Sequence, residues 1–154
     1  MKFLVTGGAG FIGSHIAEAL LARGDSVRVL DNFSTGKREN IEALIQKSGR
    51  SLLALIEGDI RDASRVGEAV RGMDAVFHSA AFVSVPQSMD EPQECFDVNV
   101  SGTHLLLESA RRAGVRRVVL ASSAAVYGES AVLPLREETP LQPKSPYALS
   151  KRIN

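Results

Sequence analysis

The sequence predicts an α/β protein with a doubly wound parallel sheet wrapped by helices. Two observations predict this fold class: β-prone runs alternate with helix-length segments, and glycine or polar residues follow the runs. Strands that are separated by helices need crossover connections, which produce parallel sheets. The 154 residues match the size of one domain, and a hydrophobic content of 44% is enough for a core.

The predicted elements follow in a regular order. The β-prone run Lys2–Thr6 is followed by a glycine cluster. Apolar residues then recur at helical spacing from Phe11, which predicts a helix that ends at Gly24. Further strands are predicted at 26–30, 52–56, 75–77 and 117–121, and further helices around 41–45, at 62–70 and at 98–112, with Asp62 as an N-cap. Four of the six prolines lie between Pro134 and Pro146, which indicates a loop before helical pattern resumes at Tyr147.

Composition excludes several function classes. Eighteen basic residues balance eighteen acidic ones, so a nucleic-acid partner is not expected. No apolar run is long enough for a membrane helix or a signal peptide, and we expect a cytoplasmic protein without a membrane partner. The single cysteine, Cys95, excludes an internal disulfide, and the three histidines show no metal-ligand spacing, so no metal is expected.

The glycine cluster has the spacing of a dinucleotide-binding turn. Gly7, Gly10 and Gly13 lie between the first strand and the first helix, where backbone can approach a pyrophosphate at a helix N-terminus. Asp31 ends the second strand, where a carboxylate can hold an adenosine ribose and repel the 2′-phosphate of NADP. The alternatives are a turn without ligand, or a phosphate held by Lys37 and Arg38.

Two more strand ends carry candidate residues. Asp59 follows the third strand and can accept a hydrogen bond from an adenine amino group, or can simply form a turn. The small residues Ser79, Ala80 and Ala81 follow the fourth strand, where they would let a cofactor lie against the backbone or let a helix pack closely.

A possible proton-transfer set lies near the end of the chain. Tyr147 and Lys151 are four residues apart and share a helix face, where an ammonium can stabilise a phenolate. Such a pair alone usually marks a solvated face. Ser122 and Ser123 end the fifth strand, at the edge where parallel sheets bind ligands, and a serine there can contact the hydroxyl that the tyrosine deprotonates.

Taken together, these sequence motifs resemble the N-terminal part of an extended short-chain dehydrogenase/reductase of the NAD-dependent nucleotide-sugar epimerase/dehydratase family, similar to UDP-glucose 4-epimerases. The resemblance is carried, in order, by residues 6–15, 31–36, 58–62, 78–81, 99–103, 122–128 and 146–151. It implies a Rossmann-type NAD-binding domain over 1–154, incomplete, with the remaining strands and a C-terminal substrate domain outside this chain.

The resemblance also implies residue roles. Tyr147 would be the acid/base, Ser123 the catalytic serine, and Lys151 the partner that binds the nicotinamide ribose and stabilises the phenolate. The implied cofactor-binding residues are Gly7, Gly10, Phe11, Ile12, Gly13, Asp31, Asn32, Ser34, Gly36, Asp59, Ile60, Ala80, Ala81, Asn99, Ser122, Tyr147 and Lys151. Ser84, Ser123 and Tyr147 would face the sugar.

One departure from the family's motifs distinguishes between the activities found in this family. Sugar 4,6-dehydratases of this family carry an Asp-Glu pair after the catalytic residue, where this chain has Ala124 and Ala125. We therefore expect an isomerase, a nucleotide-sugar 4-epimerase with a UDP-sugar as partner, that oxidises C4 transiently with bound NAD. The alternatives are another enzyme of the family (a dehydratase, decarboxylase or reductase) or a catalytically silent NAD-binding fragment. The helices at 98–112 and from 147 onward could form a homodimer.

Overall fold

The computed structural model describes residues 1–49, 51–129 and 133–154. They divide into two compact units. The sheet unit comprises Met1–Ala81 and His104–Ala121, and the helical unit comprises Phe82–Thr103 and Ser122–Asn154. The prediction that 1–154 form one domain remains a prediction.

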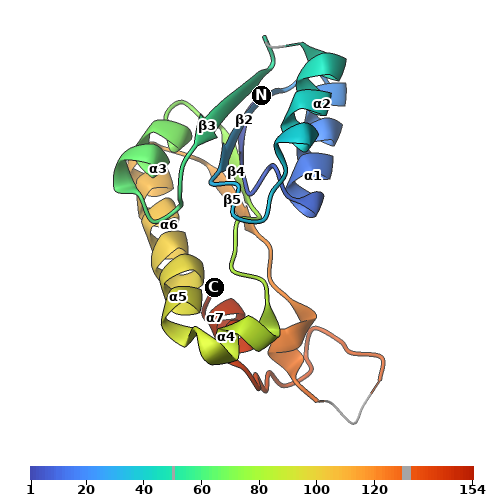
Figure 1. Cartoon of the computed structure of the whole chain (residues 1–154), viewed down its shortest axis with the longest axis vertical. Coiled ribbons are helices and arrows are strands. Elements are labelled where there is room, and N and C mark those ends of the chain that lie inside the picture. The colour runs from blue at the N-terminus through green and yellow to red at the C-terminus, as the bar shows by residue number, and fades with distance from the viewer. Residues whose placement is uncertain (50, 130–132) are drawn as a thin grey trace. The chain divides into compact units, whose positions relative to one another are not determined.

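Five parallel strands form the centre of the sheet unit, in the order β3-β2-β1-β4-β5 (Figure 1). They are β1 (Lys2–Thr6), β2 (Ser26–Asp31), β3 (Leu53–Glu57), β4 (Ala75–His78) and β5 (Arg117–Leu120). This confirms the predicted Rossmann-type fold. Because the strand order reverses at β1, the carboxyl ends of β1 and β4 flank the switch point where such sheets bind ligands.

Helices cover both faces of this sheet. Helices α1 (Phe11–Ala22) and α2 (Arg38–Ser48) lie on one side, and α3 (Ala63–Val70) lies on the other (Figure 1). Leu4 and Val5 of β1 are completely buried, which explains the uninterrupted apolar run of this strand. Burial of each such side chain stabilises the folded state by about 1.5–3 kcal/mol. The core between sheet and helices is formed by Phe3, Val5, Ala17, Leu20, Val27, Val29, Ile41, Leu44 and their neighbours.

The predicted N-cap of α3 is confirmed. The Asp62 carboxylate accepts hydrogen bonds from the amides of Ser64 and Arg65, at 2.8 and 3.2 Å. These amides have no acceptor within the helix, so the cap fixes where α3 begins.

The helical unit consists of short elements. They are α4 (Val85–Asp90), α5 (Pro92–Phe96), the π-helical turn η1 (Asp97–Gly102), the 3₁₀ turn η2 (Ala124–Tyr127) and α7 (Pro146–Ile153). Both α4 and α5 pack against α7. Helix α6 (Thr103–Arg112) continues from η1 into the sheet unit.

The structure corrects the sequence prediction in several places. Strands β2 and β4 extend one residue further than predicted, and β5 ends one residue earlier, at Leu120. The helix expected at 98–112 is a π-helical turn followed by α6, and its start lies one residue earlier. Strand β3 is shifted by one residue, to Leu53–Glu57. Helices α4 and α5 were not predicted, because each is at most six residues long and begins beside a proline, so helical periodicity has no room to develop.

None of the helices in the described part of the chain has the length and apolar character needed to cross a bilayer.

Candidate functional site

The glycine-rich turn of the sheet unit joins β1 to α1 at the switch point. Gly7 has a φ of 68°, and a Cβ there would lie 2.6 Å from the Ala80 amide nitrogen. A Cβ on Gly13 would overlap the carbonyl oxygen of Gly7 and lie 2.7 Å from its carbonyl carbon. The turn therefore excludes side chains on both sides, which leaves the N-terminus of α1 accessible to an anion.

The tip of this turn is held by the last residue of β2 and by a residue of α2. The Ala9 amide donates to the Asp31 carboxylate (2.8 Å), and the Ala9 carbonyl accepts from the side-chain amide of Asn40 (2.7 Å). Asp31 is 7% exposed and also accepts from the Phe33 amide (2.8 Å). Each carboxylate oxygen keeps a second lone pair, so Asp31 can hold the turn and still accept from a ribose hydroxyl.

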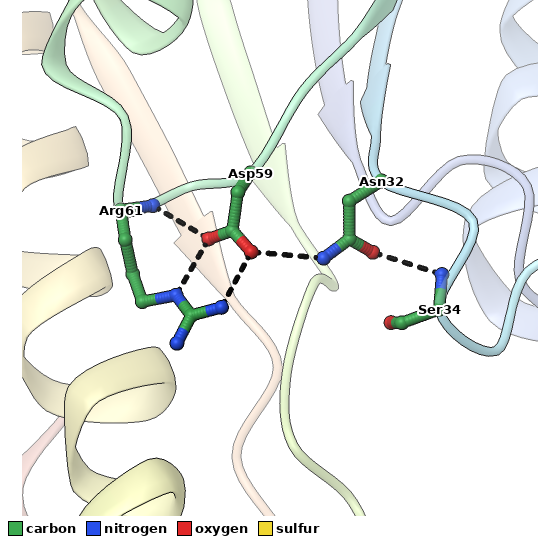
Figure 2. Close-up of polar contacts among 4 residues, drawn as sticks. All are labelled: Asn32, Ser34, Asp59 and Arg61. Carbon is green, nitrogen blue, oxygen red and sulfur yellow. Dashed lines mark hydrogen bonds and ion pairs between the residues drawn. The ribbon is translucent and has the colours of Figure 1, made fainter.

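Figure 2 shows a network between the loops after β2 and β3. Asp59 accepts from the Arg61 backbone amide (2.9 Å) and from two guanidinium nitrogens, Nε (2.9 Å) and one terminal nitrogen (2.8 Å). It also accepts from the Asn32 side-chain amide (2.9 Å), whose oxygen accepts from the Ser34 amide (3.0 Å). The hydrogen bonds from Arg61 lower the pKa of Asp59 to about 2, because their effect is larger than the opposing effect of burial.

The interpretation of Asp59 as a turn residue is therefore confirmed, since it bonds the backbone two residues ahead. The network adds that Asp59 is ionised, so its oxygens only accept hydrogen bonds. Arg38, the alternative phosphate ligand, forms an ion pair with Glu57 (2.6 Å) and stacks over Phe33 at 4.1 Å.

The end of β4 is fixed by a buried polar contact. Thr6 Oγ1 lies 2.6 Å from His78 Nδ1, and both side chains are buried. The Ala80 amide donates to the same hydroxyl at 3.3 Å. The backbone after β4 lies so close to Gly7 that a side chain there would collide with it, and the predicted contact of this segment with a cofactor or a helix remains a prediction.

The helical unit contains the predicted proton-transfer set. Lys151 is only 6% exposed, so the interpretation of Tyr147 and Lys151 as a solvated helix face is wrong for the lysine. Burial lowers the pKa of Lys151, and the nearby Cys95 opposes this. Tyr147 is half-buried in the first turn of α7.

The two strand-end serines have different neighbours. Ser122 donates to the Lys151 carbonyl at 3.4 Å. Ser123 caps η2, and its hydroxyl oxygen accepts from the Ala125 amide at 3.2 Å, which leaves the hydroxyl proton available to a substrate. Ala124 and Ala125 bring no acid or base to this turn.

Asn99 and Ser84 are held by the protein itself. Asn99 is 1% exposed, and its amide bonds the Phe82 backbone twice (2.8 and 3.0 Å) and Ser150 Oγ once (2.8 Å). Ser84 caps α4 by accepting from the Gln87 amide at 3.2 Å. Their predicted contacts with cofactor and sugar remain predictions.

A family model described as GDP-mannose 4,6 dehydratase matches residues 4–154, nearly the whole chain. The chain belongs to this family. The match includes the glycine-rich turn, the Asp59 loop and α7, so the residues that carried the resemblance all lie within it.

Curated relatives of this chain include a UDP-glucose 4-epimerase from Streptomyces lividans, 45% identical over 97% of this chain and 44% of its own length. The chain spans about half the length of the curated relatives it matches first. A UDP-glucose 4-epimerase from Stenotrophomonas maltophila, crystallised with NAD and formylated UDP-arabinopyranose, is 35% identical and has a TM-score of 0.93 over 99% of this chain and 46% of its own. A dTDP-glucose 4,6-dehydratase double mutant from Streptomyces venezuelae, crystallised with NAD, is 42% identical with a TM-score of 0.91 over 99% and 49%.

The predicted site residues fall into two groups within this family member. The sheet unit holds Gly7, Gly10, Phe11, Ile12, Gly13, Asp31, Asn32, Ser34, Gly36, Asp59, Ile60, Ala80 and Ala81. The helical unit holds Ser84, Asn99, Ser122, Ser123, Tyr147 and Lys151. Phe11 and Ile12 are 80% and 60% exposed at the start of α1, whereas Ile60 is buried.

Sequence reasoning missed four residues that hold these groups in place. Asn40 and Arg61 act in the sheet unit, and Ser88 and Ser150 in the helical unit. Arg61 and Ser150 lie inside the strings that carried the resemblance, so the signal for them was available. Nothing in the sequence pattern marks Ser88, because its helix was itself not predicted.

Proposed function

We propose that this chain is the cofactor-binding and catalytic part of an NAD-dependent nucleotide-sugar 4-epimerase acting on a UDP-sugar. The observation that carries the proposal is the set of Ser123, Tyr147 and buried Lys151 within one compact unit. The names of the most similar relatives support the substrate class.

The residues present fit a dinucleotide. A Cβ would fill the cradle at Gly7 and Gly13, and Asp31 keeps acceptor capacity for a ribose. The sheet unit would hold the pyrophosphate with the turn and the adenosine with Asp31, Asn32 and Asp59. NAD, when bound, supplies a reversible hydride acceptor for C4 of the sugar. The ion pair of Arg38 with Glu57 supports NAD over the phosphorylated cofactor, since the guanidinium already has a carboxylate partner.

Residues of the helical unit carry out the proton transfer. Tyr147 takes the proton from the sugar 4-hydroxyl as C4 is oxidised. It returns the proton after the 4-keto sugar has rotated to present its opposite face for reduction. The Lys151 ammonium stabilises the phenolate through its charge, and its burial makes that interaction stronger than in water. Ser123 donates its hydroxyl proton to the same sugar oxygen and so orients it.

The lack of an acid/base pair after Ser123 favours epimerisation over dehydration. Elimination of water needs one group to remove a proton and another to protonate the leaving hydroxyl. The methyl side chains of Ala124 and Ala125 can do neither. The similarity to a dTDP-glucose 4,6-dehydratase makes dehydration the competing activity to test.

The test uses the full-length protein with NAD and UDP-glucose, UDP-galactose and their N-acetyl analogues, with sugars followed by NMR. We expect interconversion at C4 without accumulation of NADH. Tyr147→Phe, which keeps the ring and removes only the hydroxyl, should lower kcat at least 100-fold. A 4-keto-6-deoxy product would refute epimerisation in favour of dehydration, and accumulation of NADH would favour a dehydrogenase.

We also propose a cytoplasmic homodimer that uses the helices at 98–112 and from 147 onward. Leu107 on α6 is exposed, at 39%, and can contribute to an apolar contact with a second copy. Light scattering of the full-length protein should give twice the monomer mass, and Leu107→Glu should reduce it; a monomeric wild type would exclude this assembly.

A further inference from the structure

The main chain of Tyr147 is held by two buried serine hydroxyls of the helical unit. Ser88 of α4 accepts a hydrogen bond from the Tyr147 amide at 3.2 Å, and Ser150 of α7 donates one to the Tyr147 carbonyl at 2.7 Å. Both serines are completely buried. The two peptide groups that flank the tyrosine side chain are thus each tied to a hydroxyl.

The contact from Ser88 is unusual because of its position in the helix. Tyr147 follows Pro146 at the start of α7, where amides have no acceptor within the helix. The N-cap Ser145 serves the next amide, that of Ala148, at 3.1 Å. Ser88 comes from a different element and is itself oriented by donating to the Val85 carbonyl at 2.7 Å.

The second contact belongs to a directional chain of hydrogen bonds. Phe82 fixes the orientation of the Asn99 amide, since its N–H can only donate to Oδ1 and its carbonyl can only accept from Nδ2. Nδ2 then donates to Ser150 Oγ, and Ser150 must donate its only proton to the Tyr147 carbonyl. The π-helical turn η1 carries Asn99 into this buried position, and such turns are frequent at functional sites.

We propose that Ser88, Ser150 and Asn99 are positioning residues that hold the Tyr147 backbone, and with it the Tyr147 phenol and the Lys151 ammonium, in the geometry needed for proton transfer. The proposal rests on the proposed function. None of the three touches the reacting atoms; they act through the tyrosine. A shift of about 1 Å in a catalytic group can cost 100-fold in rate, so small losses of anchoring have measurable effects.

The kinetic test compares Ser88→Ala and Ser150→Ala with Ser145→Ala in the full-length protein. Ser145→Ala is the matched control, because it removes a hydroxyl from the same helix start without touching the Tyr147 peptide groups. We expect the first two variants to lower kcat 10- to 100-fold, with KM changed less than threefold and the pH profile of kcat shifted to higher pH. The control should keep kcat within threefold and leave the profile in place.

Equal kinetic losses in all three variants would overturn the proposal, because they would reflect only a weaker helix. Folded Ser88→Ala and Ser150→Ala proteins with wild-type kcat would overturn it as well. Ser150→Thr keeps the hydroxyl and should recover most of the rate lost in Ser150→Ala.

Amide hydrogen exchange tests the anchoring without any assay of activity. In the wild-type protein we expect the Tyr147 amide to be as protected as that of Leu149, which bonds the Ser145 carbonyl within the helix. Ser88→Ala should speed its exchange at least tenfold and leave the Ala148 amide unchanged. Unprotected exchange of the Tyr147 amide in the wild type would overturn the anchoring, whereas a wild type with this protection and no epimerase activity would overturn only the proposed function.

Discussion

Gly13 offers the sharpest test of the dinucleotide turn. In Gly13→Ala the new methyl would meet the carbonyl group of Gly7 and lie 2.8 Å from the Gly8 Cα, and all of these atoms belong to the backbone of the turn. Backbone cannot rotate away as a flexible side chain does, so the turn must open. Overpacking of this kind costs about 3 kcal/mol, while alanine gains about 1 kcal/mol over glycine inside a helix. We expect a net loss of about 2 kcal/mol.

Gly67 provides the matched control. It lies within α3, and a Cβ there would meet no atom within 4 Å. Gly67→Ala should therefore stabilise the protein by about 0.5–1 kcal/mol, through helix propensity alone. The two substitutions are chemically identical, and they differ only in what surrounds the added methyl.

The assays are urea unfolding and calorimetric titration with NAD, both on the full-length protein. Gly13→Ala should unfold at lower urea concentration and bind NAD at least tenfold more weakly, because the pyrophosphate needs the closed turn. Gly67→Ala should bind NAD like the wild type. If Gly13→Ala unfolds within 0.5 kcal/mol of the wild type and keeps its affinity for NAD, the close packing of this turn is not what forms the site.

Three further predictions concern single side chains. Asp62→Ala removes the N-cap of α3 and should cost about 1 kcal/mol in thermal unfolding, whereas Asp62→Asn should cost much less. Asp59 has its pKa lowered from 3.8 to about 2, which corresponds to about 2.4 kcal/mol, and to about 1 kcal/mol after discounting for its 26% exposed side chain. Because the pKa of Asp59 is lower in the native state, this contribution to stability is complete above pH 3.8 and is lost as the pH falls towards 2. Arg61→Met should reduce the stability that is lost over this pH range. Acid unfolding that is unchanged in Arg61→Met would contradict a stabilising ion pair. Lys151→Met should abolish turnover, since it removes the ammonium that stabilises the Tyr147 phenolate; a kcat within tenfold of the wild type would contradict this.

The sheet and its ligand-binding edge could be predicted from the sequence, because their signals are local. The β-prone run Lys2–Thr6, the glycines after it and the acidic residue that ends β2 can each be recognised from neighbouring residues. Their order along the chain then determines a parallel sheet, since alternating strands and helices have few other ways to bury their apolar faces. The N-cap Asp62 belongs to the same class of local signal.

The helical unit was harder to predict, because its elements are short and are stabilised by one another. Helices α4 and α5 have at most six residues each, too few to be stable alone, and both pack against α7. The partners of Tyr147 show the same dependence: Ser88 lies 59 positions before it in the chain, and no local pattern connects them.

The sequence by itself determined the fold class, the glycine turn and the pairing of Tyr147 with Lys151 on one helix, since all of these follow from residues within a few positions of each other. Only the tertiary structure decided that Lys151 is buried, that Asn32 bonds Asp59 from another loop, and that the Tyr147 amide is held by Ser88. The physical reason is that burial and most hydrogen-bond partners depend on which segments meet in space, and a side chain gains its electrostatic environment only when the chain has brought those segments together.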